Sequence, residues 1–356
     1  MTASRSPDEF MPAPQAALLQ AAYGAQTVQM LYVAAKLGLA DHLQHRHATA
    51  AALAHTLGVN ASALQRILRG LVSLGVCAES AEGQFSLTSV GAYLRSDHPD
   101  SLQPRLLFNG EVQYALWTEA LATVQTGEAA SQRLFGMPFY DYLARHPAVG
   151  VLFDRTMASA VRYRHRPVVD AYDFGQFRTI VDVGGGNGAL LVEILTAYPH
   201  PTGIVFDLPR LADGVRQTLA AAGLTARCRF IGGNALEGVP AGGDAYLLAN
   251  LVLNWEDEEA IVALHHCRQG LAPQGKLVLV DWLIPAAHEP REGFRFWDTV
   301  MTDLVMLVTY GSQRGRIRTR AEFQTLLRAA GFTLTAFVPT QASVWVIEAV
   351  PMTGVV

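Results

Sequence analysis

Charge and cysteine are both scarce in this sequence of 356 residues. Only 16% of the residues are charged, the formal net charge is -4 and the pI is near 6.3, which argues against a nucleic acid as the main partner. The three cysteines, Cys77, Cys228 and Cys267, are widely spaced and odd in number. No disulfide framework is therefore predicted, and a reduced, cytoplasmic protein is expected.

Long hydrophobic runs are also lacking. No stretch approaches the roughly 18 uninterrupted apolar residues of a membrane-spanning helix, and the longest one, TVMTDLVMLVTYG, carries Asp303 near its middle. The amino terminus, MTASRSPDEFMPAPQ, has an acidic pair where a signal peptide needs an apolar segment. We therefore expect no membrane contact, and a flexible tail over residues 1–14.

Half of the residues are apolar, which is enough for the cores of two domains. Residues 15–104 begin with QAALLQAAYGAQTVQMLYVAAKLGLADHL, in which apolar residues recur at helical spacing. Two shorter helices joined by GVN follow, and Asn60 is expected to cap the second. EGQFSLTSVGAYL then predicts a hairpin and a further helical turn, and this order of elements is typical of a winged-helix domain.

A winged-helix order raises the hypothesis of DNA binding. The second helix, ASALQRILRGLVSLG, offers only Arg66 and Arg69, whereas a groove-reading helix usually presents several cations and polar side chains. Its pattern is that of a core or interface helix. We therefore favour a dimerisation domain with no nucleic-acid partner, and keep a DNA-binding regulator as the alternative from another class.

Residues 105–174 predict several helices that connect two domains and gather aromatic side chains. A segment between domains often forms a wall of a ligand site. Tyr140, in GMPFYDYL, is a candidate for a hydrogen bond to a substrate. His165, flanked by Arg164 and Arg166, is a candidate for contact with an acidic substrate, although a solvated surface is the favoured interpretation.

From residue 175 the pattern changes to strands that alternate with helices. The strands are RTIVDV, GIVFD, RCRFIG, AYLLAN and KLVLVDW, and the helices are GALLVEILTAY, PRLADGVRQTLAAAG and EEAIVALHHCRQGL. Such alternation predicts βαβ units and a doubly wound, mostly parallel sheet of the α/β class. TLTAFVPT and SVWVIEAV then predict an antiparallel pair at one edge.

The first strand runs into a glycine-rich loop, VDVGGGNGALL, where the backbone can approach a ligand at the start of a helix. Its spacing is ambiguous, because Gly184-x-Gly186-x-Gly188 suits S-adenosylmethionine whereas Gly184-x-Gly186-x-x-Ala189 fits a dinucleotide. Asp207 suits either ligand, since both carry ribose hydroxyls. Asp182 favours S-adenosylmethionine, because a carboxylate there would neutralise an amino-acid ammonium, which a dinucleotide lacks. The loop also follows about 180 residues of chain, whereas it opens the chain in many dehydrogenases.

These motifs resemble the class I S-adenosylmethionine-dependent methyltransferases, in the family of plant-type and bacterial small-molecule O-methyltransferases. The matching stretches are AYDFGQFRTIVDVGGGNGALLVEIL, FDLPRLADG, FIGGNALEGVP, LVLNWEDEEAIVALHHCRQGLAPQGKLVLVDWLIP and DLVML…RIRTRAEFQTLLRAAGF. The resemblance implies a Rossmann-like cofactor domain over residues 175–356. It also implies a homodimer formed through the N-terminal domain, with a small aromatic substrate between the domains.

The resemblance assigns roles by position. The implied cofactor contacts are Asp182, Gly184, Gly186, Asp207, Leu208, Asn234, Ala235 and Trp255. Among them, Asn234 stands where the family usually has an aspartate facing the adenine, and its side-chain oxygen can still accept a hydrogen bond from the adenine amino group. The implied substrate contacts are Phe153, Met157, Met301, Thr302 and Met306.

The usual catalytic base of the family is missing. Many members read His-Asp-Trp where this sequence reads Leu253-Asn254-Trp255, and leucine cannot take a proton. Of the two acids that flank the histidine, one is kept as Asp281 and the other falls on Ile317. Leu-Asn-Trp also resembles a bacterial subgroup that tailors anthracyclines, some of whose members methylate a phenol without a strong base while relatives catalyse decarboxylation, hydroxylation or pericyclic reactions.

Methyl transfer remains feasible without that histidine. A general base contributes roughly 10²–10⁴-fold, whereas aligned reactants reach effective molarities of about 10⁵–10⁸ M. We therefore predict an O-methyltransferase of a small phenolic natural product. The alternatives are a C- or N-methyltransferase, or non-methylating chemistry with the cofactor bound. The remaining catalytic candidates are Asn254, Asp281 and Tyr140. No metal is expected, because His265, His266 and Cys267 are consecutive on a helix and point in different directions.

Overall fold

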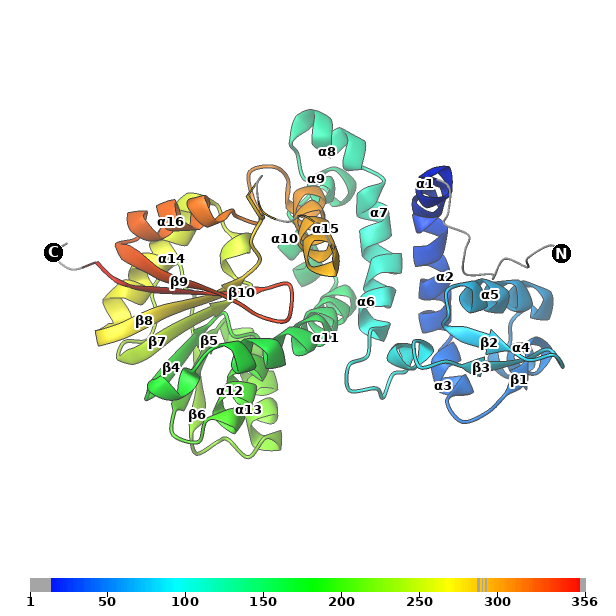
Figure 1. Ribbon diagram of the computed structural model, residues 1–356, viewed down its shortest axis with the longest axis horizontal. Helices are drawn as coiled ribbons and strands as arrows, with labels where there is room; N and C mark the ends of the chain where they lie inside the picture. The colour runs from blue at the N-terminus through cyan, green and yellow to red at the C-terminus, as the bar shows by residue number, and fades with distance from the viewer. Residues whose placement is uncertain (1–13, 287–288, 290, 292, 353–356) are drawn as a thin grey trace, which may run out of the picture. The chain divides into compact units, whose positions relative to one another are not determined.

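The computed structural model describes residues 14–286, 289, 291 and 293–352, so all but the last residue of the predicted tail lies outside the described residues. The chain divides into two compact units (Figure 1). The N-terminal unit comprises residues 1–115 and 148–159, and the sheet unit comprises residues 116–147 and 160–356. The segment predicted as a connector, residues 105–174, is thus shared between the two units.

The N-terminal unit contains short helices and a three-stranded antiparallel sheet of order β1-β3-β2. Its elements include α1 (Pro14–Ala22), α2 (Gly24–Lys36), α3 (Leu39–Leu43), β1 (Ala48–Thr49), α4 (Ala50–Leu57), α5 (Ala61–Ser73), β2 (Cys77–Glu79), β3 (Gln84–Leu87) and α6 (Gln103–Phe108). The predicted cap is confirmed, since the Asn60 side chain accepts a hydrogen bond from the Ala63 N–H at 2.9 Å. Leu64, Leu68 and Leu71 bury one face of α5, as helical spacing predicts.

A seven-stranded sheet of order β6-β5-β4-β7-β8-β10-β9 organises the sheet unit. Its strands are β4 (Thr179–Val183), β5 (Thr202–Asp207), β6 (Cys228–Gly232), β7 (Gly243–Ala249), β8 (Leu271–Asp281), β9 (Phe332–Pro339) and β10 (Trp345–Pro351). The first five strands of this order are parallel, and β10 and β9 form the predicted antiparallel edge. Chain order reverses between β4 and β7. In such sheets ligands bind at the carboxyl ends of the strands beside this switch point.

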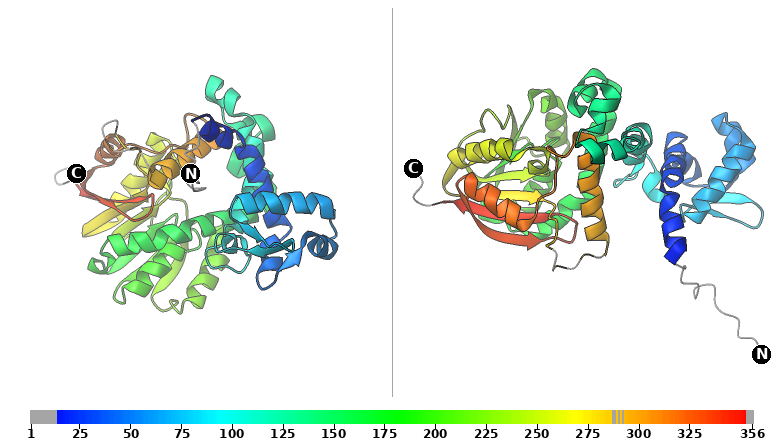
Figure 2. Two further views of the ribbon diagram at one scale, coloured as in Figure 1. Left: turned by 45° about the vertical axis from the view of Figure 1, so that its right-hand side comes forward. Right: turned by 90° about the horizontal axis from the view of Figure 1, so that it is seen from above.

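Helices cover both faces of the large sheet (Figures 1 and 2). One apolar cluster joins the sheet to α11 (Pro147–Ala171), α12 (Ala189–Ala197), α13 (Ala212–Ala221) and α15 (Gly293–Tyr310). The other joins it to α14 (Asp257–Gly270) and α16 (Arg320–Ala329). Neighbouring residues of β4 divide between the two, with Ile180 in the first and Val181 in the second. The central strands are therefore apolar throughout, because both of their faces are buried.

Shorter helices of the sheet unit precede the sheet in the chain. They are α8 (Ala120–Thr126), α9 (Ala130–Phe135) and α10 (Phe139–Arg145), and α7 (Tyr114–Trp117) crosses the boundary between the units, as does α11. α9 and α15 are joined where the Ser131 hydroxyl donates to the Thr309 carbonyl at 2.8 Å. Within the part of the chain that the structure describes, every helix is too short or too polar to cross a bilayer.

Candidate active site

The loop after β4 has a backbone that requires glycine. Gly184, Gly186 and Gly188 have φ angles of 69°, 59° and 79°, in the left-handed region that other residues rarely adopt. A Cβ atom at Gly184 would lie 2.6 Å from the Leu251 side chain, so the segment after β7 lies directly against this loop. A Cβ atom at Gly186 would have no neighbour within 4 Å, which leaves room for a ligand.

Asp182 is the most unusual polar group of the site. The residue is 1% exposed, and neither of its carboxylate oxygens has a hydrogen-bond partner. Burial, and secondly the charge of Asp207, raise its pKa to about 7. A buried carboxylate without donors is unfavourable unless a ligand supplies them. An ammonium group would supply both charge and donors, so the residues present fit the amino-acid end of S-adenosylmethionine.

Asp207 lies on the other side of the same loop. Its Oδ2 accepts a hydrogen bond from the Gly186 N–H at 2.8 Å, and its Oδ1 accepts one from the Leu208 N–H at 2.6 Å. The loop therefore holds this carboxylate at the end of β5, the position predicted for a ribose contact. Leu208 itself is 41% exposed.

The residues predicted at the adenine follow β6 and β7. The Asn234 side chain forms a local turn, since its Oδ1 accepts from the Leu236 N–H at 3.0 Å and its Nδ2 donates to Glu237 at 3.2 Å. An amide oxygen has a second lone pair, so the predicted bond from the adenine amino group stays compatible with this turn. Ala235 is buried and Trp255 is half-buried, both in the apolar cluster of α14 and α16.

An apolar cluster occupies the position of the missing base. Leu253 and Ile317 are each 5% exposed and belong to the same cluster, together with Trp282 and Met306. These are the two positions at which the resembled family carries its histidine and one of the flanking acids. The structure thus shows that both replacements are apolar and pack in one core, although 64 residues separate them in the chain.

Asp281, the acid that is kept, ends β8 beside this cluster. It is 1% exposed, its Oδ1 accepts from the Trp282 N–H at 2.9 Å, and its Oδ2 has no hydrogen-bond partner. Burial raises the pKa of this carboxyl to about 7, and the N–H groups of Trp282 and Leu253 and the charge of Arg318 oppose the rise. Asp281 therefore titrates near neutral pH, as a proton acceptor requires.

This raised pKa predicts how stability depends on pH. Because the folded carboxyl binds its proton more tightly than the unfolded one, the stability it contributes is lost as pH rises from about 4 to about 7. We expect Asp281→Asn to match the wild-type protein near pH 4 and to exceed its free energy of unfolding at pH 8. Urea denaturation of both proteins at the two pH values measures this. If the difference in free energy of unfolding between variant and wild type is the same at both pH values, the prediction is contradicted.

Asn254, the other residue predicted beside the base position, forms a local cap. Its Nδ2 donates to the carbonyls of Asn250 at 3.1 Å and Leu251 at 3.3 Å. The side chain thus closes the turn that follows β7. This is a structural role, and it does not require contact with a substrate. Contact of Asn254 with an acceptor remains a prediction.

Arg318 fixes the segment that carries Leu253, Asn254 and Trp255. Its guanidinium is almost fully buried and donates to the carbonyls of Val252 and Trp255, both at 2.9 Å, and to Asp257 at 2.7 and 3.0 Å. Close by, the backbone N–H of Arg316 donates to the Leu253 carbonyl at 3.0 Å. The sequence offered no local signal for this role, because it depends on contacts about 60 residues away.

Arg318→Lys is expected to lower the free energy of unfolding by about 2 kcal/mol, because lysine cannot reproduce the planar set of donors. Arg316→Lys is a matched control, since Arg316 also binds Asp257 but is partly exposed, and it should cost less than about 1 kcal/mol. Chemical denaturation of the two variants measures the difference. If both variants lose the same free energy of unfolding, the buried guanidinium of Arg318 has no special role.

Tyr140 lies on α10 in the sheet unit. Its ring stacks on Tyr310, with centroids 5.7 Å apart, and a side-chain hydrogen bond joins the two residues. The residue is 48% exposed; partial burial raises the pKa of its hydroxyl, while the hydrogen bond with Tyr310 and the charges of Arg314 and Arg210 oppose the rise. The sequence did not predict that Tyr310 contacts Tyr140, because Tyr310 stands there only as the last residue of an apolar helical segment.

The predicted substrate contacts divide between the two units. Met301, Thr302 and Met306 lie on α15 of the sheet unit, and Met306 is buried in the cluster of Leu253 and Ile317. Phe153 and Met157 belong to the N-terminal unit, where the Phe153 ring packs 5.6 Å from Phe108 and Met157 is 38% exposed. The three α15 residues thus share a unit with the candidate catalytic groups Asn254, Asp281 and Tyr140, whereas Phe153 and Met157 belong to the other unit.

The preference for a solvated surface around His165 is wrong. Arg164 is 5% exposed, with its guanidinium 4.4 Å from the Trp282 ring centroid and 3.7 Å from Asp298. His165 is 4% exposed and lies 3.9 Å from Glu193. Only Arg166 is exposed, in a pair with Asp170. Helical spacing carries Arg164 and His165 inward because Val168 and Val169, one turn later, are in the core.

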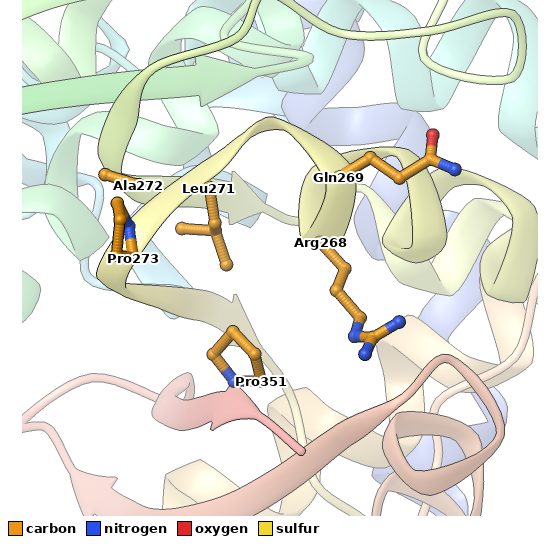
Figure 3. Close-up of a pocket in the computed structure, with 6 residues that line it drawn as sticks. All are labelled: Arg268, Gln269, Leu271, Ala272, Pro273 and Pro351. Carbon is orange, nitrogen blue, oxygen red and sulfur yellow. The ribbon is translucent and has the colours of Figure 1, made fainter. Parts of the chain in front are cut away.

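Two surface hollows lie at the opposite end of the sheet from these groups. The first is formed by the end of α14, the start of β8 and Pro351, and Gln269 points away from Arg268 in it (Figure 3). The second follows the starts of β4, β5 and β6. Ligands of doubly wound sheets bind at carboxyl ends, so neither hollow is the active site. Among the described side chains, no cluster of three or more His, Cys, Asp or Glu is arranged to hold a metal.

Comparison with known proteins gives consistent matches over both units. Residues 117–333 match the O-methyltransferase domain, and residues 19–97 match the O-methyltransferase dimerisation domain. The chain is 41% identical over 335 residues to phenazine O-methyltransferase PhzM of Lysobacter antibioticus, which covers 94% of this chain and 96% of the relative. It is 35% identical over 315 residues to aclacinomycin 10-hydroxylase RdmB of Streptomyces purpurascens, covering 87% and 82%.

Among solved structures, it resembles the O-methyltransferase NcsB1 from neocarzinostatin biosynthesis in complex with S-adenosylmethionine and 2-hydroxy-5-methyl naphthoic acid. The TM-score is 0.77 at 28% identity, and the match covers 94% of this chain and 98% of that one.

Proposed function

Because this chain belongs to the O-methyltransferase family, we propose that it transfers a methyl group from S-adenosylmethionine to the hydroxyl of a small aromatic natural product. The observation that carries the proposal is Asp182, a buried carboxylate without donors, beside a glycine loop with space for a ligand. Relatives named for phenazine methylation and a neighbour bound to a hydroxylated naphthoic acid support an aromatic acceptor.

The residues of the sheet unit divide the work of holding the cofactor. Asp182 would neutralise the ammonium group, Asp207 would accept hydrogen bonds from the ribose, and Trp255 would lie beside the adenosine. S-adenosylmethionine supplies, when bound, a methyl group on a cationic sulfur. Gly186 allows the backbone to approach it closely, because no atom lies within 4 Å of the position that a side chain would take there, whereas Gly184 lets the loop pack against Leu251.

The acceptor is expected to be a phenol that ionises readily. Leu253, Ile317 and Met306 are buried apolar side chains of one cluster and offer no proton acceptor. Transfer would then depend on alignment of the two reactants and on desolvation. Asp281 is the candidate to take the proton, Asn254 to position the hydroxyl, and Tyr140 to hydrogen-bond the acceptor, with Met301 and Thr302 of the sheet unit as candidate substrate contacts.

A second function, non-methylating chemistry with the cofactor bound, is favoured by the same apolar cluster. The absence of the family histidine removes the group that a methyl transfer most often uses, and one relative over most of the chain is named a hydroxylase. Decarboxylation of an aromatic polyketide, or its hydroxylation with dioxygen and a two-electron reductant as co-reactants, would then replace methyl transfer, with the cofactor retained as a structural or electrostatic component.

The protein is proposed to work as a cytoplasmic homodimer formed through its N-terminal unit. Residues 19–97 match a dimerisation domain, and Leu18, Leu19 and Tyr23 of α1 and the turn after it are exposed apolar side chains. Large apolar side chains exposed in one region are typical of a surface that another chain covers.

The test uses purified protein, methyl-labelled S-adenosylmethionine and a metabolite extract of the source organism, read by mass spectrometry. A labelled aromatic product establishes methyl transfer and identifies the acceptor. A changed metabolite without label, formed only when the cofactor is present, supports the second function instead. Failure to bind S-adenosylhomocysteine in calorimetry would refute both.

A further inference from the structure

Asn250, the residue that follows β7, has an unusual backbone. Its φ is 54°, and it is the one residue other than glycine with a positive φ among those described. Asparagine adopts this conformation more readily than most residues, yet it remains uncommon outside glycine. Such residues concentrate at ligand sites, where the surrounding structure holds them in place.

Hydrogen bonds on both sides fix this backbone. The Asn250 N–H donates to the Val280 carbonyl at 2.8 Å, which continues the pairing of β7 with β8. Its carbonyl accepts the Asn254 side chain at 3.1 Å. The side-chain Oδ1, by contrast, is buried and has no hydrogen-bond partner. A fixed backbone thus presents a polar atom whose partner the protein itself does not supply.

The position of Asn250 connects it with Asp182. β4 and β7 are neighbouring parallel strands, and Asp182 of β4 pairs with Leu247 of β7. Asp182 and Asn250 therefore both lie at the carboxyl ends of the two strands that flank the switch point. Leu251 contacts the loop at Gly184, and a Cβ atom on Gly185 would lie 2.6 Å from the Asp182 carboxylate. Asp182 therefore lies against Gly185, and the segment of Asn250 and Leu251 lies against the neighbouring Gly184.

We propose that Asn250 is a further cofactor-binding residue, whose side-chain oxygen accepts a hydrogen bond from the ammonium that Asp182 neutralises. This inference rests on the proposed function. An ammonium has three donors, and a carboxylate together with a neutral oxygen satisfies them better than a carboxylate alone. A neutral amide also suits the site, because Asp182 and Asp207 already repel each other there.

The experiment compares two ligands by calorimetry: S-adenosylhomocysteine, which has the amino-acid end, and methylthioadenosine, which lacks it. Asn250→Gly keeps a residue that tolerates the left-handed backbone and removes only the amide. We expect its affinity for S-adenosylhomocysteine to fall roughly 10-fold or more, as for a lost hydrogen bond to a charged group. Its affinity for methylthioadenosine should be unchanged.

Two further variants complete the test. Asn250→Asp keeps an acceptor oxygen and should retain the wild-type preference for S-adenosylhomocysteine. Asn187→Gly is a control within the same loop. The Asn187 side chain accepts a hydrogen bond from the Ala189 N–H at 3.1 Å, and its loss should not change the preference between the ligands.

Equal losses for both ligands in Asn250→Gly, or no loss for either, would overturn the inference and leave the proposed function intact. Loss of the preference in Asn250→Asp would overturn it as well, and this variant decides the matter if Asn250→Gly does not fold. If the wild-type protein binds neither ligand, the proposed function fails and the inference fails with it.

Discussion

Asp182→Asn is expected to weaken the binding of S-adenosylmethionine at least roughly 100-fold. Removing one partner of a buried, hydrogen-bonded charge pair typically costs about 2–5 kcal/mol, and each 1.4 kcal/mol is a factor of ten in affinity. The effect should be large because Asp182 is 1% exposed and accepts no hydrogen bond from the protein, so the ligand would provide all of its partners. Isothermal calorimetry of the variant and the wild type measures the loss.

The same substitution should stabilise the ligand-free protein, which separates a binding role from a structural one. The raised pKa of Asp182 means that its ionised form is unfavourable in the folded state, so stability is lost as pH rises from about 4 to about 7. We expect a higher melting temperature for Asp182→Asn than for the wild type at pH 8, and no such gain near pH 4. A variant that binds the cofactor as the wild type does would contradict the assigned role.

Leu253→His is expected to raise the rate of methyl transfer to weakly acidic phenols roughly 100-fold, within the range of a general base. The reason is that the Asp281 Oδ2 is buried, has no partner and belongs to a carboxyl whose pKa the Leu253 N–H affects. A histidine at position 253 would find an acceptor for one ring nitrogen and use the other as a base. Initial rates with a series of phenols of increasing pKa measure the gain.

Two variants control this experiment. Leu253→Asn has a polar side chain without a base and should give no gain, and the double variant Leu253→His with Asp281→Asn should lose most of it. Readily ionised phenols should benefit least, because they need no base. If Leu253→His accelerates no phenol at any pH, proton removal does not limit the reaction, and the role given to the apolar cluster is wrong.

Much of the fold could be predicted because its signals are local. The strands from β4 to β10 and the helices between them follow from apolar runs and turn residues, and the Asn60 cap follows from one residue before a periodic segment. The glycines at 184, 186 and 188 were recognisable because a positive φ restricts the residue type directly. The amino-acid sequence also determined that the family's histidine base is missing, because leucine at position 253 has no group that can accept a proton in any fold.

Only the tertiary structure decided which of these residues meet, and in what environment. Leu253 and Ile317 share one apolar cluster, and Arg318 binds the carbonyls of Val252 and Trp255, across more than 60 residues of chain. Arg164 and His165 read as solvated cations but are buried, and Asn250 carries no signal until its backbone angle and buried oxygen are seen. Periodicity reports the conformation of neighbouring residues, whereas burial and pKa depend on segments that pack together from distant parts of the chain.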